Sequence, residues 1–135
     1  MSKKLLRVAA LILAAVPMFG HHAVTMFEFG KVVSVSGTVT KFDWSNPHIH
    51  IYLDVTKEGA IEKWDVEGLS PNLHKHQGSQ WNANMLKVGD KITVKANPMK
   101  DGSKVIRLRS IVMPDGKELD GGFEYGLEPT PGAAK

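Results

Sequence analysis

The 135-residue sequence contains no cysteine. Disulfide bonds, thiolate metal ligands and a cysteine nucleophile are therefore excluded, and the fold must be stabilised by its core alone. Common enzyme motifs are missing as well: there is no Gly-x-Ser-x-Gly elbow, no His-Glu-x-x-His pair and no glycine-rich phosphate loop. These absences predict that the protein is not an enzyme. A Ser-His-Asp triad, whose members need not be adjacent, is left open.

Acidic residues are absent before Glu28. Three residues in this stretch are basic: Lys3, Lys4 and Arg7. The apolar run at residues 8–16 has nine residues, whereas a membrane-spanning helix needs roughly twenty. A basic start, a short apolar run and a small residue, Gly20, form an export signal. We therefore expect residues 1–20 to be a signal peptide and the mature protein to be periplasmic or secreted, without a membrane span. An uncleaved N-terminal anchor is the alternative.

The positive charge of the chain belongs to this predicted signal. The formal net charge is +3, from 17 basic and 14 acidic residues. Removal of the signal peptide leaves 14 basic residues against 14 acidic ones, so the mature protein is formally neutral. Nucleic-acid binding needs a retained basic face, and we therefore expect no nucleic-acid partner.

Alternating, β-branched segments dominate the mature chain and predict five strands. They lie at residues 31–44, 48–55, 60–67, 91–96 and 104–113. In the second strand, Ile49 and Ile51 should face the core. His48 and His50 have the opposite parity and should face outward. The alternation of the first strand changes phase near Thr40, which predicts a β-bulge there.

Between the third and fourth strands, residues 70–86 lack strand alternation and begin with Ser70-Pro71, a typical helix start. Three strands, a helical connection and two further strands are the order of the OB fold. The sequence therefore predicts an all-β protein, a small OB-like five-stranded Greek-key barrel with one short helix between strands 3 and 4. An open β-sandwich is the alternative. Six residues are expected in one core: Ile49, Ile51, Leu53, Val66, Ile92 and Val94.

We expect this domain to cover residues 21–119. Residues 120–135 are rich in glycine, proline and glutamate without periodicity, and such composition predicts a flexible tail.

The six histidines form three pairs: His21-His22, His48-x-His50 and His74-x-His76. Cleavage after Gly20 would make His21 the mature N-terminus, which offers an α-amino nitrogen and an imidazole to one metal ion. Copper(II) favours such nitrogen-rich sites. His48 and His50 should project from one strand face, close enough to bind the same ion. We therefore expect His21, His22, His48 and His50 to bind one copper or zinc ion, with solvent-exposed polar residues as the alternative.

His74 and His76 should point apart on a helix, and we expect both to be exposed to solvent. The Asn46-Pro47-His48 turn places an amide at the mouth of the barrel beside Trp44. Small barrels bind ligands at such loop ends. Trp44 and Asn46 are therefore candidate ligand-binding residues, although the three tryptophans are most simply core or rim aromatics.

For the terminal histidines to reach this turn, residues 23–30 must fold back across the barrel. Ordering a segment costs about 1–2 kcal/mol per residue, so the segment needs an anchor. We expect Phe27 or Phe29 to dock against the barrel and supply it.

Six short motifs follow one another along the chain in a characteristic order. They are His21-His22-Ala23, residues 35–42 (VSGTVTKF), Asn46-Pro47-His48, residues 64–67 (WDVE), residues 88–94 (VGDKITV) and residues 114–117 (PDGK). Over residues 21–119 this set resembles the DUF6152 family of small exported bacterial proteins of unknown function. The resemblance implies an exported β-barrel domain, with the paired histidines and the Asn-Pro-His turn as candidate functional positions. It implies no reaction.

The expected function is an exported binding protein that holds a transition metal, copper favoured, or a small ligand near the Asn46-Pro47-His48 turn. Imidazole ligands must be neutral, so metal affinity should fall as the pH drops through about 6. The alternative is a scaffold domain that binds another envelope protein without a metal.

Overall fold

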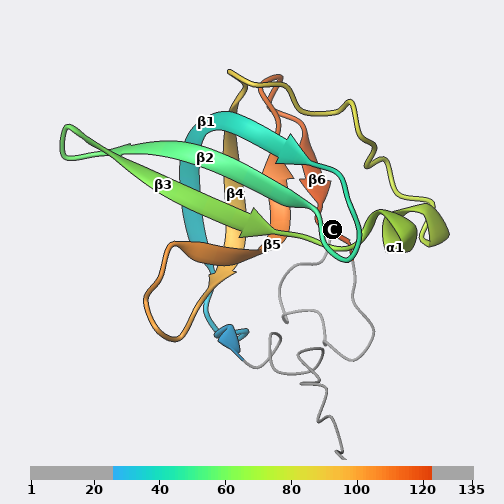
Figure 1. Ribbon diagram of the computed structural model, residues 1–135, viewed down its shortest axis with the longest axis horizontal. Coiled ribbons are helices and arrows are strands. Elements are labelled where there is room, and N and C mark those ends of the chain that lie inside the picture. Colours follow the sequence, from blue (N-terminus) through green and yellow to red (C-terminus); the bar gives the residue numbers. More distant parts are fainter. Residues whose placement is uncertain (1–25, 123–135) are drawn as a thin grey trace, which may run out of the picture.

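The computed structural model describes residues 26–122 (Figure 1). The predicted signal peptide and residues 123–135 of the predicted tail lie outside this range. Within it the chain forms six strands and one helix: β1 (Val33–Asp43), β2 (His50–Lys57), β3 (Ala60–Glu67), α1 (Pro71–His76), β4 (Lys91–Pro98), β5 (Val105–Val112) and β6 (Glu118–Asp120).

Strands β1 to β5 close into a barrel. They are neighbours in the order β3-β2-β1-β4-β5, and each of these pairs is antiparallel. The ring is closed by parallel pairing of Asp65–Glu67 with Val105–Arg107. An antiparallel five-stranded ring closed between its third and fifth strands confirms the predicted OB-like barrel and excludes the open sandwich. The short β6 pairs with the end of β5. Three residues are too few to show alternation, which is why the sequence did not predict this strand.

Strands β2 and β3 form a long hairpin, which extends to the left of the barrel in Figure 1. Its turn is only two residues long, because Lys57 pairs with Ala60. Both turn residues have positive φ, 50° at Glu58 and 81° at Gly59, as a tight hairpin turn of this twist requires. The turn fixes the register, so that His50 lies opposite Glu67 and Tyr52 opposite Asp65.

Strand β1 bends around the barrel and pairs with both β2 and β4. Its register with β2 shifts between Val39 and Lys41, which confirms the bulge predicted at Thr40. At Gly37 a Cβ atom would lie 2.8 Å from the carbonyl oxygen of Asp54. The crossing of the two strands therefore leaves room only for glycine at this position.

The barrel interior is apolar. All six predicted core residues are buried, with exposures of 3% or less, which confirms the predicted parity of the strands. Full burial of one such side chain contributes about 1.5–3 kcal/mol. Trp81 and Leu86, from the segment after α1, complete the core.

The helix α1 is shorter than the predicted segment 70–86. Ser70 caps its start, since its side chain accepts a hydrogen bond from the backbone N–H of Leu73 at 3.1 Å, and Pro71 occupies the first turn. The helix ends at His76, just before Gly78, whose φ is 60°; a left-handed glycine is common beyond a helix end. No helix among residues 26–122 is long and apolar enough to span a bilayer.

The chain before β1 is anchored to β4 and the loop that follows it. Phe27 is 4% exposed and forms a bridge with Met99, which confirms the predicted docking. Asn97, fully buried on β4, donates hydrogen bonds through Nδ2 to the carbonyl oxygens of Phe29 (3.3 Å) and Lys31 (2.7 Å). The segment is therefore attached by both apolar and polar contacts.

Candidate functional site

His50 lies on the outer face of the β2–β3 hairpin. Its Nδ1 is 2.8 Å from Oδ1 of Asp65. A carboxylate only accepts hydrogen bonds, so Nδ1 of His50 carries a proton and donates it. This hydrogen bond raises the pKa of His50 above its ordinary value, although partial burial opposes the shift.

His48 is held in the same way. Its Nδ1 lies 3.1 Å from the carbonyl oxygen of Gly68, which can only accept, so Nδ1 of His48 is a donor as well. The ring also lies beside a buried ion pair between Arg107 and Glu67. Arg107 Nη1 is 3.4 Å from His48 Nδ1, and Glu67 Oε1 is 3.8 Å from it.

The two rings therefore share one arrangement. Among residues 26–122, the nearest hydrogen-bond partner of each ring, Gly68 O for His48 and Asp65 Oδ1 for His50, lies at Nδ1, so in each neutral ring with a protonated Nδ1 the Nε2 atom keeps its lone pair. In this tautomer the longer contact of His48 Nδ1 with Arg107 Nη1 joins two donors and is not a hydrogen bond. The rings belong to residues of equal parity, about 6.6 Å apart along an extended chain, and both are partly exposed. Histidines that bind metals are typically held by Nδ1 against a carboxylate or a carbonyl group. This face can offer two imidazole nitrogens to one ion.

A complete ligand set is not found in the described part of the chain. Among residues 26–122, no three histidine or acidic side chains are grouped so that they could hold a metal ion. His21 and His22, the other two predicted ligands, lie outside the described residues. The four-histidine site therefore stays a prediction, for which the structure describes two members.

The two predicted ligand-binding residues of the turn have different surroundings. Asn46 is exposed and its peptide bond to Pro47 is cis. Trp44 packs against α1 instead, where its ring stacks on that of His74 at 5.6 Å. A ligand-binding role for Trp44 and Asn46 stays a prediction.

His74 was expected on the surface, and this expectation is wrong. Its exposure is 1%, because the ring lies between Trp44 and Trp81, whose ring is 5.1 Å away. Its Nδ1 is 3.0 Å from Oγ of Ser79, and burial lowers its pKa. His76 is exposed as expected. The chain returns after α1 and places Trp81 over one side of the helix, a contact that sequence spacing does not reveal.

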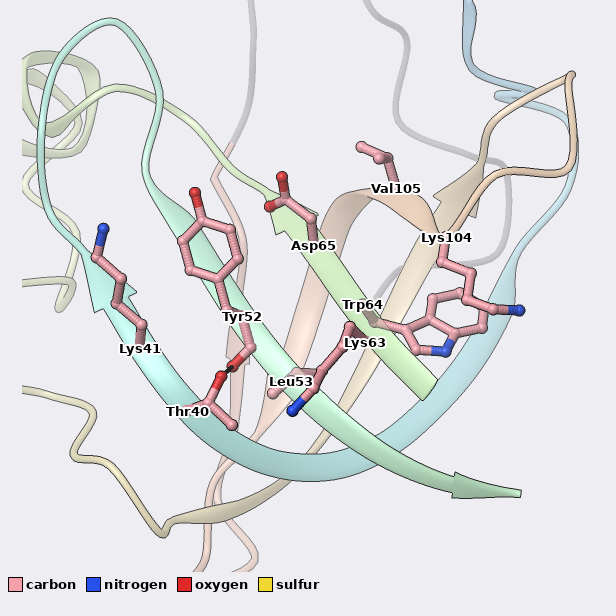
Figure 2. Close-up of a pocket in the computed structure, with 9 residues that line it drawn as sticks. All are labelled: Thr40, Lys41, Tyr52, Leu53, Lys63, Trp64, Asp65, Lys104 and Val105. Carbon is pink, nitrogen blue, oxygen red and sulfur yellow. Dashed lines mark hydrogen bonds between the residues drawn. The ribbon is translucent and has the colours of Figure 1, made fainter. Parts of the chain in front are cut away.

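A groove of about 530 Å³ lies on the β2–β3 hairpin (Figure 2). It is lined by residues of β1, β2, β3 and the start of β5: Thr40, Lys41, Tyr52, Leu53, Lys63, Trp64, Asp65, Lys104 and Val105. Two contacts connect it to His50, which bonds Asp65 and stacks on Tyr52 with ring centres 6.0 Å apart. This groove was not predicted from the sequence. The outward parity of Tyr52 and Asp65 was a usable signal, whereas the approach of Lys104 depends on barrel closure.

The fold and this face define a small OB-type barrel with an anchored histidine pair and an adjoining aromatic groove on its outer surface. The chain belongs to DUF6152, a family of unknown function, whose model matches residues 9–107. No curated protein matches the sequence.

Solved structures with partial similarity include two crystal forms of Rim1, a mitochondrial single-stranded DNA-binding protein of S. cerevisiae. One is 14% identical with a TM-score of 0.43, covering 68% of this chain and 97% of Rim1. The other is 10% identical with a TM-score of 0.44, covering 70% and 98%. A ZRD-deleted mutant of TiaS in complex with agmatine is 21% identical with a TM-score of 0.44, covering 73% of this chain and 24% of that protein. The fold assignment rests on the strand pairing described above.

Proposed function

We propose that the protein is an exported binding protein, rather than an enzyme, that holds one transition-metal ion on the outer face of β2. The ligands in the described part of the chain are Nε2 of His48 and Nε2 of His50. The observation that supports this role is the fixing of both Nδ1 atoms by groups that only accept hydrogen bonds, Gly68 O and Asp65 Oδ1. Copper is the favoured ion, since imidazole nitrogens suit it, and zinc is the alternative.

The remaining ligands in this proposal are His21 and His22. Four residues lie between His21 and Met26, so the five Cα–Cα steps span at most about 17 Å when extended. The segment that follows is connected to His48 through contacts of β4 and β5. Asn97, which holds the carbonyl of Lys31, is paired in register with Arg107, and the guanidinium of Arg107 contacts His48.

The metal proposal is tested by titrating copper(II) into the purified mature protein in a weakly coordinating buffer. We expect one tight site, and His48→Ala or His50→Ala should each weaken it at least about tenfold, equal to about 1.4 kcal/mol. His76→Ala is the matched control, because His76 is an exposed histidine on α1, and it should leave the affinity unchanged. Equal affinity in all three variants would contradict the proposal and favour a metal-free scaffold.

The role of the terminal histidines needs a separate variant. One additional glycine before His21 moves the α-amino group away from the imidazole of His21 and should weaken copper binding while His48 and His50 remain intact. Unchanged binding would restrict the site to the strand pair. N-terminal sequencing of the exported protein, with elemental analysis of the same sample, identifies both the mature terminus and the bound metal.

Export is tested through the apolar run at residues 8–16. The double substitution Leu11→Asp and Leu13→Asp interrupts the run that the export machinery binds. We expect the variant to accumulate in the cytoplasm as an uncleaved precursor, detected by fractionation and mass spectrometry. Normal export of the variant would contradict a signal peptide.

A further inference from the structure

The groove beside the histidine pair has the composition of an organic ligand site. We propose that it binds a small planar aromatic molecule with a single negative charge, such as an aromatic carboxylate. This inference does not depend on the metal, because the groove is lined by other side chains than His48 and His50.

The size and floor of the groove favour a flat apolar body. A volume of about 530 Å³ lies within the range of roughly 300–1,000 Å³ that is typical of small-molecule pockets. Tyr52 and Trp64 are its aromatic lining residues, on neighbouring strands, and Val105 adds aliphatic surface (Figure 2). Aromatic rings favour offset or edge-to-face contact with other rings.

The charge at the rim favours an anion. Three lysines from three different segments line the groove, Lys41, Lys63 and Lys104, whereas Asp65 is its one acidic lining residue. Asp65 is already engaged by Nδ1 of His50. Among the lining residues, three ammonium groups therefore face one carboxylate, and each lysine also has an acidic neighbour outside the lining that an anion would have to replace.

Two of these ammonium groups already lie near the aromatic rings. Lys104 Nζ is 5.5 Å from the ring centre of Trp64, and Lys41 Nζ is 5.4 Å from that of Tyr52. Figure 2 shows the side chain of Lys104 alongside the indole of Trp64. A molecule that packs its ring against Tyr52 or Trp64 would therefore have an ammonium group within reach of its carboxylate.

The lysines are bound to carboxylates that a ligand can replace. Lys104 pairs with Glu62 at 3.1 Å, and Lys63 pairs with Asp54 at 2.6 Å. The lysine side chains are 46% and 76% exposed, and exposed pairs of this kind contribute only about 0–1 kcal/mol. A ligand carboxylate in a partly apolar groove competes well with such partners.

The same carboxylates disfavour a polyanion. Lys41 has Asp43 within 3.5 Å, so each lysine of the rim has an acidic side chain next to it. A nucleic acid needs a continuous row of unpaired cations for its phosphates, and this face alternates positive and negative charge. A single carboxylate requires only one lysine to change partner.

The proposal is tested by titrating naphthoate into the protein and recording proton–nitrogen correlation spectra in the presence of a metal chelator. The sequence has three tryptophans, so the indole N–H region holds three signals, and Trp64→Phe identifies that of Trp64. We expect saturable movement of the Trp64 signal. The Trp81 signal should stay in place, since its N–H donates to the carbonyl of Asp120 away from the groove.

Charge selection is tested with a matched ligand and a matched variant. Naphthalenemethanol has the same rings without the charge and should bind about fivefold more weakly, equal to about 1 kcal/mol. Lys104→Gln should weaken naphthoate to a similar degree. Lys95→Gln should not, although Lys95 also forms an exposed ion pair, with Glu118 at 2.9 Å, because it lies outside the groove.

Three results would overturn the proposal. They are movement of all three indole signals together, equal affinity for the charged and the neutral ligand, and equal weakening by Lys104→Gln and Lys95→Gln. Displacement of naphthoate by a lower concentration of single-stranded oligothymidylate would replace the proposal with nucleic-acid binding. Because a chelator is present throughout, failure here leaves the metal proposal to its own titration.

Discussion

Two His-x-His sequences in this chain have opposite environments. His48, two residues before β2, and His50, the first residue of β2, are both partly exposed. On α1, His74 is buried between two tryptophans and His76 is exposed. Two residues are one full repeat of a strand but about 200° of a helix. The spacing therefore determines whether the side chains share a face, and tertiary packing determines which face is covered.

The two environments also shift the histidine pKa in opposite directions. The carboxylate of Asp65 raises the pKa of His50, whereas burial lowers that of His74. The ring of His74 serves as an aromatic spacer, since within residues 26–122 its Nε2 has no hydrogen-bond partner. The strand pair keeps its rings partly exposed to solvent, whereas the helix uses its buried ring for packing.

The largest expected effect is the loss of the buried ring. His74→Ala opens a cavity between Trp44 and Trp81 and should lower the free energy of unfolding by about 3 kcal/mol, as for other large-to-small core substitutions. His76→Ala, on the exposed face of the same helix, should change it by less than about 0.5 kcal/mol. Urea unfolding followed by tryptophan fluorescence measures both.

His74→Phe sharpens this comparison. It keeps a ring between the tryptophans and removes the buried nitrogen without a partner, so it should destabilise the protein less than His74→Ala does. Equal losses for the alanine and phenylalanine variants would contradict the role of His74 as an aromatic spacer.

A smaller effect is expected at the helix cap. Ser70→Ala removes the hydrogen bond to the N–H of Leu73 at the start of α1 and should lower the free energy of unfolding by about 1 kcal/mol. Ser70→Asp keeps an acceptor at this position and should remain close to the wild type. If both substitutions had the same effect, the hydrogen-bond acceptor of Ser70 would not be what stabilises the start of α1.

The smallest expected effect is a change in how steeply the free energy of unfolding varies with pH. The lowered pKa of His74 makes the protein lose stability as the pH falls below 6.5, its ordinary value, because the unfolded chain then binds the proton more readily. The raised pKa of His50 contributes stability that is complete below 6.5 and is lost as the pH rises through its folded value. The two windows therefore lie on opposite sides of 6.5.

Urea midpoints measured from acidic to alkaline pH in a chelating buffer separate the two groups. His74→Phe should remove part of the loss on the acidic side. His50→Gln should remove part of the loss on the alkaline side. If the urea midpoint of His74→Phe fell at acidic pH as steeply as that of the wild type, the lowered pKa of His74 would be contradicted. If the midpoint of His50→Gln fell at alkaline pH as steeply as that of the wild type, the raised pKa of His50 would be contradicted.

Much of the barrel could be predicted because its evidence is local. Alternation identified the buried face of β2, the change of phase at Thr40 identified the bulge, and Ser70-Pro71 identified the helix start. The order of these elements was then enough to predict the OB-like topology. β6 was not predicted, because a strand of three residues is too short to show alternation.

The surroundings of the site were less predictable because they depend on contacts between distant segments. Asp65 meets His50 only because the hairpin turn has two residues; a turn one residue longer would exchange the two faces of β3. Lys104 reaches Trp64 through the parallel closure of β3 and β5. The burial of His74 depends on Trp81, and the terminal histidines lie outside the described residues.

The hydrogen bonds of Asn97 have a consequence for the order of events during synthesis. The residues that it holds, Phe29 and Lys31, precede it by 68 and 66 positions. A chain made from its N-terminus cannot form these bonds until β4 has left the ribosome. The first residues of the domain are therefore held in place only once β4 is available to bind them.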